Sequence, residues 1–199
     1  MKKIISLALC CIVICLSLTA CSGPNADMTE ENITATVEAT EKALKEFDTD
    51  NLKKYVDSAT LSTIMGYADK HQQFKDLGKA IFANLEMEVK SIDIENQTVT
   101  VSVTNKDLAQ AAEEFVTELN SEYSTFQLLS QLNNDNFLDA KLSELRTRIE
   151  KSELFPESVE VTLSVTQDKK NLILSFDSNA EDVVSGGALS VIKSIYSVG

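Results

Sequence analysis

Side chains that could carry acid–base chemistry are few in this chain. His71 is the only histidine, and it lies in the polar run from Asp69 to Gln73. A histidine that acts as a general base needs a carboxylate partner and a pocket, and Asp69 could supply the carboxylate. The polar run is more typical of a surface histidine at the start of a helix. We therefore interpret His71 as a surface residue.

A second arrangement with chemical potential pairs an acid, Asp57 or Asp69, with a tyrosine, Tyr55 or Tyr67. Such a pair could work if a cavity enclosed it and raised the pKa of the carboxyl group. However, the sequence contains no G-x-S-x-G, phosphate-loop or dinucleotide fingerprint. We predict no catalytic residues and keep this pair as the basis of an alternative, enzymatic reading.

Metal ligands are also sparse. A transition-metal site draws on histidine and cysteine, and this chain has one histidine and no cysteine after Cys21. The run Asp48 to Asn51 is like the start of a calcium loop, but its sixth position is Lys53 instead of glycine and its twelfth is Ala59 instead of glutamate. We expect no metal site and no cofactor.

The four cysteines all lie near the N-terminus. Two lysines precede an apolar run from Ile4 to Leu18, and two small residues then lead to Cys21. A transmembrane helix needs about 20 mainly apolar residues, and this run is a little shorter. Its length favours a signal peptide. An uncleaved membrane helix is the alternative, and the lysines would orient either segment in the same way.

The residues Leu18-Thr19-Ala20-Cys21 resemble a lipobox, the sequence at which bacterial lipoprotein signals are cut. The resemblance implies cleavage between Ala20 and Cys21, removal of residues 1–20, and a diacylglyceryl group on the Cys21 sulfur. Two acyl chains would hold the protein, because each buried methylene contributes about 0.8 kcal/mol. We expect a lipid-anchored protein on the outer, extracytoplasmic face of the cell membrane, with residues 21–28 as a short tether.

Processing would also remove Cys10, Cys11 and Cys15. With Cys21 acylated, no thiol would remain for a disulfide, a zinc site or a nucleophile. The domain would then be stabilised by burial of apolar side chains alone, which is feasible at this length.

The rest of the chain is strongly acidic. Residues 1–20 contain two lysines and no acid, so the remainder has 16 basic and 31 acidic side chains and a net charge of −15. This charge repels nucleic acid and disfavours adhesion to anionic lipid through a basic patch. It is explained by solubility without any dedicated cation-binding role.

Periodicity predicts one domain over residues 29–199. Helical spacing predicts a helix from Thr29 to about Phe47, with Asp27 or Thr29 as N-cap and an imperfect apolar stripe interrupted by Thr40. Asp50 could cap a short helix after it. A third helical region covers residues 60–82, with a possible break near Asp69.

Two segments instead show the alternation of β-strands. Residues 87–104 read as an antiparallel hairpin with a bulge near Lys90-Ser91, where the apolar phase changes. Residues 159–176 read as a second hairpin after Pro156. Between them, Asp107 could cap a helix that continues toward Leu129, and a further helix covers residues 138–149.

Charged and aromatic side chains on these helices have ordinary structural explanations. We interpret the basic residues Lys141, Arg146, Arg148 and Lys151, which are interspersed with acids, as a solvated, ion-paired face. We place the helical aromatic residues in the core rather than in a ligand cage: Phe47, Tyr55, Phe74, Phe115, Tyr123 and Phe126.

A closing helix is predicted from about Glu181, and Gly186-Gly187 weakens its first turns.

The predicted fold class is α+β, with an antiparallel sheet of about four strands from two hairpins that packs against amphipathic helices. The N-terminal helix, the segment Phe47 to Tyr55 and the later hairpins resemble small lipoproteins of Gram-positive bacteria with nuclear-transport-factor-like or cystatin-like domains. In those folds a curved sheet wraps around helices and can leave a conical pocket. The long helical pair at residues 108–152 departs from that pattern.

These observations predict a non-enzymatic, lipid-anchored domain that binds a partner protein, a peptide or a small apolar ligand, and no nucleic acid. The alternative is a nuclear-transport-factor-like enzyme that uses the carboxylate and tyrosine described above. A solute-binding component of a transporter is disfavoured, because such proteins usually have two larger lobes around the ligand.

Overall fold

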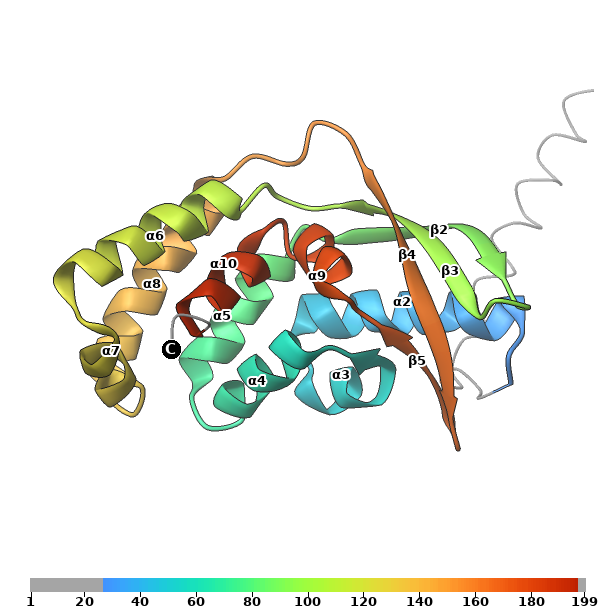
Figure 1. The fold of residues 1–199 in the computed structure, drawn as a ribbon, viewed down its shortest axis with the longest axis horizontal. Helices are drawn as coiled ribbons and strands as arrows, with labels where there is room; N and C mark the ends of the chain where they lie inside the picture. The colour runs from blue at the N-terminus through green and yellow to red at the C-terminus, as the bar shows by residue number, and fades with distance from the viewer. Residues whose placement is uncertain (1–26, 197–199) are drawn as a thin grey trace, which may run out of the picture.

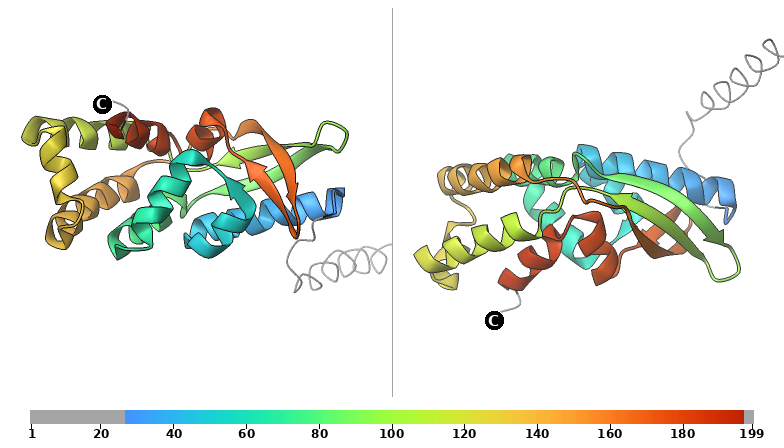
Figure 2. Two further views of the ribbon diagram at one scale, coloured as in Figure 1. Left: turned by 60° about the horizontal axis from the view of Figure 1, so that its bottom comes forward. Right: turned by 90° about the horizontal axis from the view of Figure 1, so that it is seen from above.

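The protein is seen in a computed structural model that describes residues 27–196 (Figure 1). Its first element is α2 (Glu30–Glu46), and Thr29 is the N-cap, since its side chain accepts a hydrogen bond from Asn32 N at 3.2 Å. The helix ends at Phe47, which has left-handed backbone angles. Its buried stripe includes Thr40, as the periodicity predicted. Helix α2 packs along one face of the sheet (Figures 1 and 2).

The sheet has five strands in the order β1-β5-β4-β3-β2. The strands are β1 (Val56–Asp57), β2 (Glu86–Asp93), β3 (Thr98–Thr104), β4 (Val159–Asp168) and β5 (Asn171–Ser175). Four of them are antiparallel, as predicted, but β1 adds a fifth that pairs in parallel with β5. The α+β class is confirmed, whereas a purely antiparallel sheet is wrong. Strand β1 is only two residues long, which is too short for an alternating pattern to predict it. Only its pairing with β5 identifies it as a strand.

The predicted bulge in β2 is present. Val89 pairs with Val101 and Ser91 pairs with Thr100, so Lys90 is the extra residue. The inner face of the central strands is buried valine and leucine, and alternate residues of β4 are exposed on the outer face. Strand β2 forms one edge of the sheet. There the Glu41 carboxylate of α2 accepts a hydrogen bond from Met87 N at 3.1 Å. This contact and the bulge both discourage pairing with another strand.

Three helices lie between α2 and the first hairpin: α3 (Thr49–Tyr55), α4 (Ala59–Ala68) and α5 (Gln72–Phe82). The N-cap of α3 is Asp48 and not Asp50, because the Asp48 side chain accepts from the backbone N–H groups of residues 50 and 51. Those bonds lower the pKa of Asp48 below the ordinary carboxyl value. The predicted break near Asp69 separates α4 from α5.

Between the hairpins, α6 (Ala109–Glu122), α7 (Thr125–Gln131) and α8 (Asp135–Lys151) project from the sheet as a unit that we call the helical arm (Figure 1). We predicted one helix from Leu108 to about Leu129, but extended backbone at Tyr123 interrupts it. Ser124 then begins α7 with a reciprocal capping box to Gln127. At the N-terminus of α6, the N-cap is Leu108 and not the predicted Asp107. Asp107 Oδ1 still accepts a hydrogen bond from Ala109 N at 3.4 Å.

The C-terminal segment forms two helices, α9 (Ser178–Val184) and α10 (Ala188–Tyr196), instead of one helix from Glu181. Gly186 and Gly187 separate them with φ angles of 62° and 85°. A Cβ atom at Gly186 would lie 1.9 Å from the Lys106 carbonyl oxygen, so this close approach to the arm's base requires glycine.

Apolar side chains from the sheet and from helices α2 to α6 and α8 to α10 contribute to one hydrophobic core among the described residues, whereas α7 has no buried residue. Asn105 ties several of these elements together at the base of the arm. Its side-chain amide donates to the carbonyl oxygens of Ile81, at 3.1 Å, and Val184, at 2.9 Å, and its Oδ1 accepts from Lys106 N at 2.8 Å. In residues 27–196, no helix is long and apolar enough to cross a bilayer.

Candidate functional site: the helical arm

The predicted cleavage and lipidation residues, Ala20 and Cys21, lie outside the described residues. The acids and tyrosines of the enzymatic alternative do lie within them. Asp69 is exposed, and its carboxylate accepts hydrogen bonds from Lys53 Nζ at 2.7 Å and from Thr49 Oγ1 at 2.9 Å. The bond from Lys53 is the main cause of a lowered Asp69 pKa. A carboxyl group that acts as an acid in a pocket would need a raised pKa.

The other members of that alternative have structural contacts of their own. Asp57 is exposed at the end of β1, and its carbonyl oxygen accepts from Phe176 N at 2.8 Å. Tyr67 stacks on Phe74 with ring centroids 5.3 Å apart, and Tyr55 packs against the core. None of these residues lines the grooves described below.

His71 is at the N-cap position of α5, the helix start that we predicted, but its side chain is only 13% exposed. Its Nδ1 atom lies 3.0 Å from Asp135 Oδ1 at the start of α8, so the partner is not Asp69. Gln73 makes a parallel contact, with Nε2 donating to Asp139 Oδ1 at 2.7 Å. These two contacts fasten α5 to the arm, and sequence spacing cannot reveal a partner that lies 64 residues away.

Glu181 is the one buried acid among the described residues, with 5% of its surface exposed. Its carboxylate accepts hydrogen bonds from Ser58 Oγ, from Thr60 N at 3.2 Å and from Thr60 Oγ1 at 2.7 Å. Ser58 is also the N-cap of α4. The carboxylate thus links α9 to the first turn of α4, where the helix dipole favours a negative charge. This is a structural role.

No group of three or more histidine, cysteine or acidic side chains in residues 27–196 could hold a metal ion.

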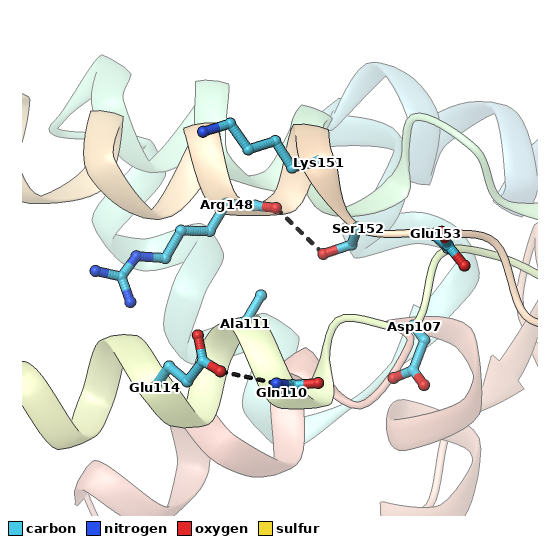
Figure 3. A pocket seen from close by; sticks show the side chains of 8 residues that line it. All are labelled: Asp107, Gln110, Ala111, Glu114, Arg148, Lys151, Ser152 and Glu153. Atoms are coloured by element: carbon cyan, nitrogen blue, oxygen red, sulfur yellow. Dashed lines mark hydrogen bonds between the residues drawn. The ribbon is translucent and has the colours of Figure 1, made fainter.

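The arm carries the surface features that could bind a partner. A groove of about 490 Å³ lies between the start of α6 and the end of α8 (Figure 3). We call it the arm groove, and its lining residues are Asp107, Gln110, Ala111, Glu114, Arg148, Lys151, Ser152 and Glu153. A smaller hollow of about 340 Å³ continues along α6 and shares Glu114 with it. Seven of the eight lining residues are polar or charged, and Ala111 is the one apolar residue.

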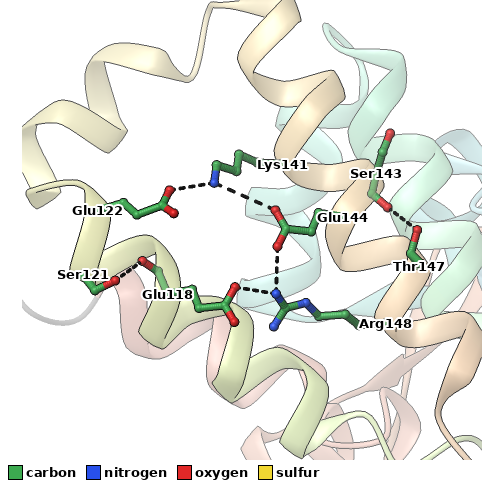
Figure 4. Close-up of polar contacts among 8 residues, drawn as sticks. All are labelled: Glu118, Ser121, Glu122, Lys141, Ser143, Glu144, Thr147 and Arg148. Carbon is green, nitrogen blue, oxygen red and sulfur yellow. Dashed lines mark hydrogen bonds and ion pairs between the residues drawn. The ribbon is translucent and has the colours of Figure 1, made fainter.

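A chain of ion pairs connects α6 to α8 farther along the arm (Figure 4). Arg148 Nη2 donates to Glu118 and, at 2.7 Å, to Glu144 Oε1. Lys141 Nζ donates to Glu122 Oε2 at 2.7 Å. The bond to Glu118 chiefly raises the pKa of Arg148, and the same bond lowers the pKa of Glu118. The predicted ion-paired face is confirmed for these residues, but their partners on α6 were not foreseen.

The tip of the arm exposes two large apolar side chains. Helix α7 has no buried residue, and Phe126 and Leu129 are 81% and 51% exposed. We predicted Phe126 to be in the core because it follows Leu119 and Tyr123 at helical spacing. That prediction is wrong, since the break at Ser124 turns the following residues away. The capping sequence Ser124-Thr125-Phe126-Gln127 was the available signal for this break.

Comparisons of the chain with protein-family models, with curated proteins and with solved structures gave no match. The fold and the arm therefore define the protein only as an α+β domain with a helical arm inserted between its two hairpins.

Proposed function

We propose that this chain is a lipid-anchored, extracytoplasmic domain that binds a partner protein through the tip of its helical arm and has no catalytic role. The observation that carries the proposal is the exposure of Phe126 and Leu129 on α7. The two large apolar side chains lie three residues apart on one helix of a strongly acidic protein, and exposed apolar patches mark interaction sites. An aromatic anchor of this kind often supplies much of an interface's binding energy.

The position of the tip supports this proposal. The chain enters the domain at Glu30, at the start of α2, and α7 lies at the opposite end of the molecule (Figure 1). If residues 21–28 tether the domain to a bilayer, the tip can extend away from that bilayer. The nearest charged residues on either side of α7 in the sequence are the acids Glu122 and Asp135. A partner with an apolar pocket and a neutral or basic rim would complement such a surface.

For the fold, we propose kinship in architecture with nuclear-transport-factor-like or cystatin-like domains. The support is α2, which packs on the face of a sheet whose four main strands are antiparallel. The parallel strand β1 and the arm between β3 and β4 depart from that pattern.

Site-specific photocrosslinking tests the proposed contact. A benzophenone amino acid would replace Phe126 in the full-length chain in its native cells. We expect a discrete crosslinked species of higher mass after irradiation. The control is the same replacement at Ile94, which is 42% exposed on the hairpin at the other end of the molecule. If position 126 gives no more crosslinking than position 94, the tip is not a protein contact.

A further inference from the structure

Helix α7 packs little against the rest of the domain. None of its seven residues is buried, and none of its side chains packs against the hydrophobic core of the described residues. Each side-chain hydrogen bond that α7 makes within the described part of the chain joins positions three residues apart, between Ser124 and Asn134. Tertiary packing therefore contributes little to keeping α7 helical.

The chain on both sides of α7 is attached to the domain. The ring of Tyr123, the C-cap of α6, meets the ring of Phe137 on α8 edge to face, with centroids 5.3 Å apart. Leu132, the C-cap of α7, packs against the core. The carboxylate of Asp135 then contacts His71. Because both ends are held, α7 can unfold locally while α6 and α8 stay folded.

The sequence of α7 gives it only a weak helical preference. Isolated helices shorter than about 12–15 residues are marginal in water, and α7 has seven residues. The segment contains no charged side chain, so no ion pair between residues four apart supports it. Thr125 and Ser130 are poorer helix formers than alanine. The reciprocal capping box between Ser124 and Gln127 is thus the main local contribution to its stability.

We infer that α7 is an order–disorder element: in the free protein it interconverts between a helix and an unfolded segment, and the partner of the tip binds the helical form. The inference deepens the proposed function and rests on it for the partner. Helical backbone brings Phe126 and Leu129 onto one face, which the unfolded segment does not maintain. The apparent affinity then scales with the helical fraction of free α7, so changes in α7 stability tune partner binding.

Nuclear magnetic resonance of the free, full-length chain in neutral dodecyl maltoside micelles tests the first half of the inference. The Cα chemical shifts report the helical fraction at each residue, and amide exchange with water reports local opening. We expect intermediate Cα shifts across α7 and fully helical shifts in α6 and α8. Amides at residues 129–131 should exchange at most about tenfold more slowly than in an unfolded segment, and those of Leu145 and Ile149 at least about a hundredfold more slowly again.

Three serine-to-alanine variants give the result a direction. Ser124→Ala removes the cap, so the ratio of helical to unfolded α7 should fall about fivefold. Ser130→Ala replaces an exposed residue of α7 by a better helix former and should raise the ratio about twofold. The matched control, Ser143→Ala, makes the same exchange at an exposed position inside α8 and should leave the ratio unchanged.

Fully helical shifts in α7, with amides protected as strongly as those of α8, would overturn the inference. The proposed function would then stand with a rigid tip.

The crosslinking assay at position 126 tests the second half. Each benzophenone-labelled variant would be produced with an excess of the unlabelled parent chain, so that the two compete for the partner. We expect crosslinking to fall about threefold with Ser124→Ala, to rise slightly with Ser130→Ala and to stay unchanged with Ser143→Ala, following the helical fraction.

Equal crosslinking of all three variants would show that the partner does not select the helix, and would overturn the inference even if α7 opens in the free chain. The proposed contact at the tip would survive that result. Absence of any crosslink at position 126 would instead remove the proposed contact, and with it the partner's selection of the helix.

Discussion

Thr40 is an unusual side chain in the core of this protein. It is fully buried on α2, and its hydroxyl oxygen has no hydrogen-bond partner. Thr36, one turn earlier, is equally buried, but its hydroxyl donates to the Asn32 carbonyl oxygen at 2.7 Å. A buried polar group without a partner costs about 1–3 kcal/mol relative to one that is satisfied. These two threonines therefore form a matched pair for measuring that cost.

We predict that Thr40→Val raises the free energy of unfolding by about 1 kcal/mol, because a methyl group of similar size replaces the unsatisfied hydroxyl. Thr36→Val should not do so, since it removes a hydrogen bond that is made. Urea unfolding of both variants, with unchanged m values, is the measurement. Equal effects of the two substitutions would show that the Thr40 hydroxyl is satisfied in solution.

The pairing of α6 with α8 depends on electrostatics at the scale of elements. The Glu118 pKa is below the ordinary carboxyl value because Arg148 donates a hydrogen bond to it. A carboxyl group whose pKa is lowered by folding stabilises the folded state above its unfolded-state pKa, and this contribution is lost as the pH falls through the folded-state pKa. The Glu118 contribution should therefore be present at neutral pH and lost in acid.

We predict that acidification from pH 7 to about 3 destabilises Glu118→Gln less than the parent protein, because glutamine has no proton to take up. The difference should be small, since the pair is exposed to solvent. Glu38→Gln is the control, because no ion pair involves this exposed acid within the described residues. Thermal unfolding across this pH range is the measurement, and identical acid sensitivity of all three proteins would contradict the prediction.

Elements with a strong local signal could be predicted from the sequence, and those defined by distant contacts could not. The change of apolar phase at Lys90 identified the bulge in β2. Strand β1 has two residues and exists only through pairing with β5. In the candidate site, the ion-paired character of α8 was predictable from its alternating charges. The groove was not, because it needs α6 and α8 side by side, and neither helix alone specifies that packing.

At the scale of the whole molecule, the main prediction concerns attachment. Cys21→Ser removes the only atom that can accept a diacylglyceryl group under the lipobox hypothesis. We expect the variant to leave the membrane fraction or to remain unprocessed at full length. Fractionation, immunoblotting and intact mass measurement would check this. A variant of mature size that stays with the membrane would show that acylation does not hold the protein there.

The bonds between Glu181 and the residues Ser58 and Thr60 have a consequence for biosynthesis. They join positions 121 to 123 residues apart, and β1 needs β5, which lies equally late in the chain. A polypeptide emerging from a ribosome or a translocation channel cannot form these contacts until residues 171–181 are free. Helix α4 and strand β1 therefore reach their final contacts only after residues 171–181 have been delivered.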